Sequence, residues 1–243
     1  MLYNRNDQVI GRALELYGEY CEGEIELLRQ LCGPGSIVAD VGANIGAVTV
    51  PLALHVGERG YVFAFEPQRV VFQTLCANVA LQSITNVECV PAALGEREAT
   101  LHVPDIRYDL EANFGGVELG AFASGRPVAQ VTLDAYAHRG PFALVKIDVE
   151  GMEIDVLRGG RALIESQRPL LYVENDRADK SSALVGELRA LRYRLFWHRP
   201  LLFNPNNARG NDANVFAADS AFSNMLCIPQ ERDASIDGLI EVA

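Results

Sequence analysis

The stretch from Ser36 to Val50, SIVADVGANIGAVTV, constrains the fold of this chain most strongly. An apolar run, Ile37–Val41, is interrupted by one acid, Asp40, and a helical pattern follows over Ala47–Leu54. A buried strand that passes through a glycine turn into a helix is the first unit of a nucleotide-binding α/β sheet. Gly42 would allow the sharp turn and a close approach of the backbone to a ligand.

The spacing of the glycines differs from the dinucleotide fingerprint Gly-x-Gly-x-x-Gly, because only Gly42 and Gly46 fit it. Asp40 would also repel a pyrophosphate bound at the helix N-terminus. S-adenosylmethionine carries an ammonium and a sulfonium group and no phosphate, so Asp40 would suit that ligand. The alternative is a strand, turn and helix with a purely structural role, since the pattern alone is only moderately specific.

Two further strands extend the predicted nucleoside site. Tyr61–Phe65 reads as a buried strand and ends in Glu66, where an acid can accept hydrogen bonds from both ribose hydroxyls. Nicotinamide and adenosyl ligands use this position alike. Asn86–Pro91 reads as a third strand, and the small residues Ala92 and Ala93 after it could leave room for adenine or could reflect close packing.

Acids follow two later strands. Asp148 and Glu150 come after the apolar strand Ala143–Ile147, and Glu174 follows the strand Pro169–Val173. Ligands of doubly wound sheets bind at this end of the strands, so these three acids are candidate general bases, with His198 as a further one. Together with Asp176 the acids could instead hold Mg²⁺. No spacing rule supports that cation, so we assign no metal ligand.

The length, charge and cysteine content of the chain limit the kinds of partner and compartment that we expect for it. The chain has 243 residues, room for one α/β domain, and a formal charge of −11 that argues against nucleic-acid and acidic-membrane partners. The five cysteines are widely spaced and no Cys-x-x-Cys occurs, which favours reduced thiols in a cytoplasmic protein. A polar N-terminus and the lack of a long apolar run predict no signal peptide and no membrane span.

The remaining segments surround one domain over residues 1–243. We expect an N-terminal helical segment, 1–32, whose helix Val9–Leu31 is broken at Gly18 and Gly23. A mobile flap, 104–127, with few large apolar anchors is expected between the hairpin strands Thr100–Val103 and Val128–Val131. A late strand is predicted at Tyr193–Trp197, another at Val215–Ala218 or Met225–Pro229, and a poorly ordered tail at 231–243.

Several of these stretches together resemble the FkbM family of S-adenosylmethionine-dependent methyltransferases, and the likeness runs from about Tyr17 to Pro229. The stretches that carry it are Val38–Gly46, Ala64–Pro67, Leu144–Gly151 with Glu153 and Leu157–Gly159, and Asn224–Pro229. The resemblance implies a class I methyltransferase fold, a Rossmann-like α/β fold. Its mostly parallel seven-stranded sheet has helices on both faces, and its last strand is antiparallel.

The resemblance also implies methyl transfer from S-adenosylmethionine, usually to oxygen on a sugar, polyketide or related small natural product. Carried over by position, the methionine part of the cofactor would be held by Asp40, Gly42, Ala43, Asn44 and Gly46. Glu66 with Pro67 would hold the ribose, and Ala92 and Ala93 would border the adenine. Asp148 and Glu150 would face the reacting methyl group, with Asp148 also a possible cofactor ligand.

Two functions from other classes remain open at the level of sequence. A nicotinamide-dependent oxidoreductase would share the strand, turn, helix and ribose acid, but it would lack the third glycine and would tolerate Asp40 poorly. A non-catalytic nucleoside-binding protein could keep the same fold, because fold does not establish activity.

Overall fold

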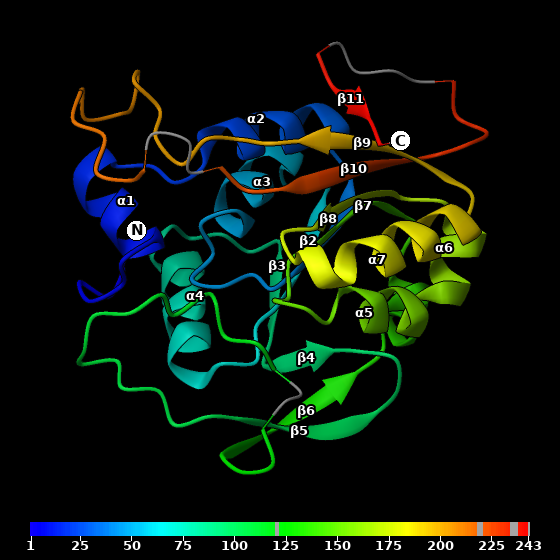
Figure 1. Ribbon diagram of the computed structural model, residues 1–243, viewed down its shortest axis with the longest axis horizontal. Coiled ribbons are helices and arrows are strands. Elements are labelled where there is room, and N and C mark those ends of the chain that lie inside the picture. The colour runs from blue at the N-terminus through cyan, green and yellow to red at the C-terminus, as the bar shows by residue number, and fades with distance from the viewer. Residues whose placement is uncertain (120–121, 218–220, 234–237, 243) are drawn as a thin grey trace.

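The computed structural model describes residues 1–119, 122–217, 221–233 and 238–242 (Figure 1). Its helices are α1 (Ile10–Tyr17), α2 (Glu22–Leu31), α3 (Thr49–Val56), α4 (Arg69–Leu81), α5 (Glu153–Gly159), α6 (Arg161–Gln167) and α7 (Ala178–Ala190), with a 3-10 helix, η1, at Leu133–Arg139. Its strands are β1 (Ile37–Val41), β2 (Tyr61–Phe65), β3 (Val87–Val90), β4 (Ala92–Leu94), β5 (Ala99–Val103), β6 (Arg126–Val131), β7 (Phe142–Ile147), β8 (Leu170–Glu174), β9 (Tyr193–His198), β10 (Asn224–Pro229) and β11 (Ile240–Glu241).

The main sheet confirms the predicted α/β fold. Its strand order among the described residues is β11-β9-β10-β8-β7-β1-β2-β3, and β1, β2, β3, β7 and β8 pair in parallel. Strand β10 lies between β8 and β9 and is antiparallel to both, as expected of the last of seven strands. The short strand β11 adds an eighth, so two residues of the tail that was expected to be poorly ordered pair with the sheet. Residues 234–237 and 243 of that tail lie outside the described residues.

Helices cover both faces of the main sheet (Figure 1). Because side chains alternate along a strand, Ala39 and Val41 of β1 pack in the layer that contains α5, α6 and α7. Val38 packs instead in the layer of α2 and α3, and Asp40 shares its face. The single acid in an otherwise apolar strand therefore lies between the sheet and the α2–α3 layer. None of the described helices has the length and apolar character that a bilayer crossing requires.

A small second sheet lies beside the main one, with strand order β4-β6-β5 (Figure 1). The antiparallel pair of β5 and β6 confirms the predicted hairpin. Ala92 and Ala93, expected to follow a strand, form the short strand β4, which pairs in parallel with β6. They are buried there, beside the end of β3.

Two boundaries differ from the prediction. Gly18 ends α1 in a left-handed conformation with φ of 75°, but Gly23 lies inside α2, so the N-terminal helix breaks once. The late strand is β10, which matches the alternative at Met225–Pro229. Residues 215–217 form no strand, and Ala218 lies outside the described residues.

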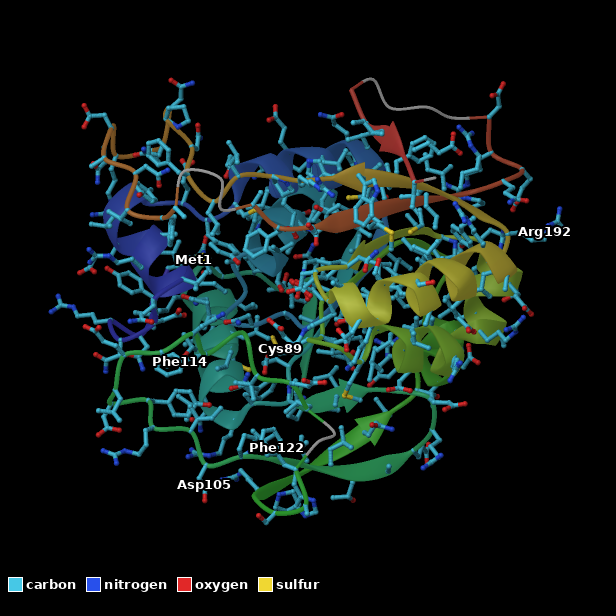
Figure 2. The ribbon with its side chains drawn as sticks, in the orientation of Figure 1. Met1, Cys89, Asp105, Phe114, Phe122 and Arg192 are labelled. Atoms are coloured by element: carbon cyan, nitrogen blue, oxygen red, sulfur yellow. The ribbon has the colours of Figure 1, made fainter. Side chains whose placement is uncertain are left out.

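The connection 104–127 is better anchored than its composition predicts. Phe114 is buried beside α4 (Figure 2), and its carbonyl oxygen accepts a hydrogen bond from Nε2 of Gln68 at 2.9 Å. The N-terminal segment pairs with it, since Asp7 bridges to Ala112. Leu119 is also buried, so the expectation of few apolar anchors is wrong. Its motion stays a prediction, and residues 120–121 lie outside the described residues.

Candidate active site

A pocket opens at the carboxyl ends of β1, β2, β7 and β8, where ligands of doubly wound sheets bind. Its lining also includes residues of β4, of the connection 104–127 and of α2. Of the predicted site residues, Gly42, Ala43, Asn44, Glu66, Pro67, Ala92, Ala93, Asp148, Glu150 and Glu174 line this pocket. Asp40 and Gly46 do not. Asp40 is fully buried, and its expected contact with a ligand, like that of Gly46, stays a prediction.

The turn after β1 forms one wall of the pocket and requires glycine at its first position. Gly42 has φ of 83°, and a Cβ atom built there would overlap the carbonyl oxygen of Asp148. The amides of Gly42 and Ala43 both donate to the carbonyl oxygen of Phe65, at 3.0 and 2.9 Å. The turn is therefore packed directly against the end of β7, and any side chain at Gly42 would push the two strand ends apart.

Lys146 is the buried cation beneath the pocket. It is paired across the strands with Asp40, and its Nζ atom lies 3.6 Å from Oδ1 of Asp40 and 3.0 Å from Oδ2 of Asp148. Asp40 also accepts a 2.6 Å hydrogen bond from Oγ1 of Thr49. Burial disfavours the charge on Lys146, but the carboxylates of Asp148, Asp40 and Glu24 outweigh it and raise its pKa. The sequence analysis assigned no role to this lysine.

Glu66 lines the pocket at the end of β2. Its Oε2 accepts a hydrogen bond from the amide of Asn44 at 3.0 Å, and its Oε1 accepts one from the amide of Gln68 at 2.8 Å. Burial raises the pKa of Glu66 to about 7, and the two amide hydrogen bonds oppose that shift. Each carboxylate oxygen can accept a further hydrogen bond, which fits an acid that recognises ribose hydroxyls.

Three acids form a cluster beside the ends of β7 and β8. One oxygen from each of Asp148, Glu150 and Glu174 lies within 4.8 Å of the others. Arg177 donates to Oε2 of Glu150 at 3.0 Å, as Lys146 does to Asp148. Glu174 is 5% exposed, and no described residue donates to its Oε2 atom. Burial and the neighbouring carboxylates raise the pKa of Glu174 far above its usual range.

The backbone conformation at Glu150, and not the alternation of side chains along a strand, brings these carboxylates together. Strand β7 ends at Ile147, and Glu150 lies in the left-handed region with φ of 54°, so the strand geometry does not continue past Asp148. Burial raises the pKa of Glu150 to about 7, although its hydrogen bond from Arg177 opposes the shift. A left-handed conformation in a residue other than glycine is typical of functional sites, where surrounding structure compensates the strain.

Two other residues, the candidate metal ligand Asp176 and the candidate base His198, fall outside the cluster. Asp176 does not belong to the group of three close carboxylates and does not line the pocket. His198 lies away from the pocket lining, and its Nδ1 atom is 2.7 Å from the hydroxyl of Tyr172. That hydroxyl also accepts a hydrogen bond from Asn224. His198 therefore takes part in a network within the sheet rather than in the pocket.

Glu24 on α2 is a pocket residue that the sequence analysis missed. It is 4% exposed and lines the pocket, and its Oε1 atom has no hydrogen-bond partner among the described residues. Burial raises its pKa to about 7, although Lys146 opposes the shift. A signal was available, because Glu24 directly precedes Ile25 and lies three and four residues before Leu27 and Leu28, on the apolar side of the helix.

Comparisons with known proteins agree with this geometry. Residues 40–196 match the model of the Methyltransferase FkbM domain. A protein named Methyltransferase 1 from Beauveria bassiana (strain ARSEF 2860) is 26% identical over 149 residues, which cover 51% of this chain and 58% of that protein. This chain therefore matches less than two thirds of that relative's length.

Two solved structures share the fold. A methyltransferase FkbM from Methylobacillus flagellatus KT superposes with a TM-score of 0.55 at 17% identity, over 80% of this chain and 44% of that one. A precorrin-6y C5,15-methyltransferase from Geobacter metallireducens GS-15 gives a TM-score of 0.55 at 13% identity, over 85% and 86% of the two chains. Since the domain match covers well over half of the sequence, from β1 to β9, this chain belongs to the FkbM family of methyltransferases.

Proposed function

We propose that this protein transfers a methyl group from S-adenosylmethionine to a hydroxyl oxygen of a small molecule, such as a sugar or a polyketide. The net negative charge of the residues that line the pocket is the observation that supports this cofactor. Among the described residues, its charged lining consists of Lys146 and five carboxylates: Glu24, Glu66, Asp148, Glu150 and Glu174. Such a lining favours a ligand with cationic groups over a dinucleotide, whose pyrophosphate would meet net negative charge.

Individual residues fit the parts of this cofactor. An ammonium group near Oε1 of Glu24 would satisfy a buried acceptor that otherwise lacks a partner. Glu66 would accept hydrogen bonds from the ribose hydroxyls, and Ala92 and Ala93 would border the adenine. The turn Gly42–Asn44 would hold the methionine part. Three strand spacings, about 14 Å, separate the ends of β2 and β8, so Glu66 and Glu174 lie well apart along the pocket.

Methyl transfer to a hydroxyl group has two requirements that the protein must meet. When bound, S-adenosylmethionine supplies an already activated methyl group, so the protein has mainly to align donor and acceptor. A hydroxyl acceptor must also lose its proton, and this calls for negative charge close to the acceptor oxygen. Asp148, Glu150 and Glu174 concentrate that charge beside the ends of β7 and β8, whereas Glu66 follows β2. We therefore assign the acid cluster to the acceptor side of the reaction.

The connection 104–127 supports a small acceptor. Asn113, Gly116 and Val117 from this segment line the pocket, and Glu118 beside them pairs with Arg177 and Lys180 at 3.2 and 2.7 Å. The segment is thereby tied to the start of α7 over the acid cluster. A bulky acceptor would have to displace these ion pairs, whereas a small one would fit beneath them.

The experiment is a methylation assay with matched acceptors. We would incubate the protein with S-adenosylmethionine and series of hydroxyl, amine and thiol compounds, and detect S-adenosylhomocysteine and methylated product by mass spectrometry. The proposal predicts product from hydroxyl compounds. Product only from amines or thiols would contradict the acceptor assignment, and cofactor binding without turnover on any acceptor would favour a non-catalytic nucleoside-binding protein.

A pair of variants sharpens the assay. Glu150→Gln should retain affinity for S-adenosylhomocysteine but lose about 10²-fold or more in turnover, because the cluster would lose a negative charge that helps the acceptor hydroxyl to lose its proton. Asp176→Asn removes the same charge just outside the cluster and should stay within about threefold of the wild type. Equal turnover of both variants would show that the acid cluster takes no part in the reaction.

A further inference from the structure

We propose that Asp148, Glu150 and Glu174 form a binding site for one hard divalent cation, with Mg²⁺ as the physiological candidate. The site itself stands on the geometry of these three side chains. Its role, to hold the acceptor hydroxyl, rests on the proposed methyl transfer. Carboxylate oxygens are the ligands that hard divalent cations prefer, with water filling the remaining positions.

The spacing of the three carboxylates fits such an ion. One oxygen from each residue lies within 4.8 Å of the others. Two oxygens on opposite sides of a cation are separated by twice the metal–oxygen distance, which is about 4.1 Å for Mg²⁺ and about 4.6–5.2 Å for Ca²⁺. Oxygens that all lie within this limit are close enough for one cation, placed between them, to contact all three residues.

Glu174 provides the observation that points to a ligand. It is 5% exposed and lines the pocket, and no described residue donates a hydrogen bond to its Oε2 atom. A buried carboxylate without a donor beside two further acids is costly unless a cation or a proton compensates it. Its position on β8 is fixed, since its neighbours in the sheet hold the strand on both sides.

The surrounding cations stabilise the cluster but leave oxygens available. Lys146 donates to Oδ2 of Asp148, and Arg177 donates to Oε2 of Glu150. No described residue donates to the second oxygen of either carboxylate. Lys146 would thus orient Asp148, and Arg177 would orient Glu150, each through one carboxylate oxygen. The second oxygen of each carboxylate would bind the metal. Among the described residues Lys146 pairs with Asp40 and Asp148 and makes no ion pair with Glu174.

The cation would act on the acceptor hydroxyl. Binding of the hydroxyl oxygen to the cation would lower its pKa and fix its place next to the methyl donor. As the new oxygen–carbon bond forms, the carbon–sulfur bond breaks and its electron pair stays on sulfur. The hydroxyl proton leaves to water. No oxidant or reductant is needed, so the step balances with the acceptor and the cofactor alone.

The test measures metal binding directly and separately from methylation. Mn²⁺ serves as the probe, because its electron paramagnetic resonance signal distinguishes free from bound ion, and Mg²⁺ is then added as competitor. We expect one Mn²⁺ site in the wild type that Mg²⁺ displaces. Glu174→Gln should weaken Mn²⁺ binding by about tenfold or more, since it replaces a charged ligand by a neutral one. Asp176→Asn should change it by less than about threefold.

Several outcomes would overturn the proposal. They are the absence of Mn²⁺ binding to the wild type, or equal Mn²⁺ affinity of the wild type and Glu174→Gln. If the wild type binds no Mn²⁺ and Glu174→Gln has a higher Tm than the wild type, the cluster shares a proton in place of a metal ion. If Glu174→Gln does not fold, Glu150→Gln provides the same comparison. Binding of S-adenosylhomocysteine in the presence of EDTA, measured in parallel, tests the proposed function independently of the metal.

Discussion

Replacement of Lys146 by methionine gives the sharpest test of how charge is arranged beneath the pocket. The side chain of Lys146 is 3% exposed and lies between Asp40, at 3.6 Å, and Asp148, at 3.0 Å. Lys146→Met keeps the length of the side chain but leaves Asp40, which is fully buried, without a cation. Removal of one partner from a buried ion pair costs about 3–5 kcal/mol, because the remaining charge stays desolvated.

The cost translates into a large change in melting temperature. For a chain of 243 residues, one kcal/mol lowers the Tm by about 2 °C, so Lys146→Met should lower it by about 6–10 °C. Lys146 also opposes the burial that raises the pKa of Glu24 to about 7, so its removal should raise that pKa further. Glu24 is then protonated at about pH 5 and carries an uncompensated charge at about pH 8, so the loss should be smaller at about pH 5.

Lys180→Met is the matched control for this experiment. Lys180 pairs with Glu118 at 2.7 Å, a shorter distance than either ion pair of Lys146, but its side chain is 38% exposed. Exposed pairs contribute about 0–1 kcal/mol, so its Tm should fall by no more than about 2 °C. Equal shifts for the two variants in thermal unfolding followed by circular dichroism would refute the reasoning, since burial would then have no effect.

Three further predictions concern the pocket. Glu66→Ala should weaken S-adenosylhomocysteine binding in calorimetry by about 1–3 kcal/mol, and unchanged affinity would exclude the ribose assignment. Gly42→Ala should unfold the protein or lower its Tm far more than Gly57→Ala, because both glycines have positive φ but only Gly42 would clash with backbone. Affinity for S-adenosylmethionine should rise between about pH 6 and pH 8, with proton release, because the pKa values of Glu24 and Glu66 lie near 7 and a cationic ligand favours their ionised forms. A flat pH profile in buffers of different ionisation enthalpy would contradict this.

The parts of the site that follow a strand directly were predictable from sequence. Gly42 and Glu66 come straight after β1 and β2, and parallel strands bring their carboxyl ends to one edge of the sheet. The local pattern of buried strand, turn and acid therefore predicts both the fold and the part of the pocket beside β1 and β2. Strand β4, only three residues long, has no such periodic signal and was missed.

The charge network was not predictable in the same way. The pairing of Lys146 with Asp40 depends on the register between β1 and β7, two strands that are distant in sequence. Glu24 reaches the pocket from a helix packed over the sheet, and Arg177 reaches Glu150 from the start of α7. Each of these contacts is set by tertiary packing. A sequence pattern shows the acids but not the cations that balance them.

The acid cluster depends on a backbone conformation that no sequence pattern indicates. Asp148 and Glu150 are two residues apart, and a strand that continued past Ile147 would place both on one side of the sheet. In the structure the strand has already ended, and the left-handed backbone at Glu150 together with Arg177 brings the carboxylates together. Such a conformation in a residue other than glycine has no signature in the sequence itself.

Isothermal titration calorimetry with S-adenosylmethionine, S-adenosylhomocysteine and NAD⁺, on the same protein at neutral pH, tests most directly whether this pocket selects a cationic adenosyl ligand. We predict binding of both adenosyl compounds at one site per chain, tighter for S-adenosylmethionine because its sulfonium adds a positive charge near the acids. NAD⁺ should give no measurable binding. Tight binding of NAD⁺ with none of the adenosyl compounds would contradict the account.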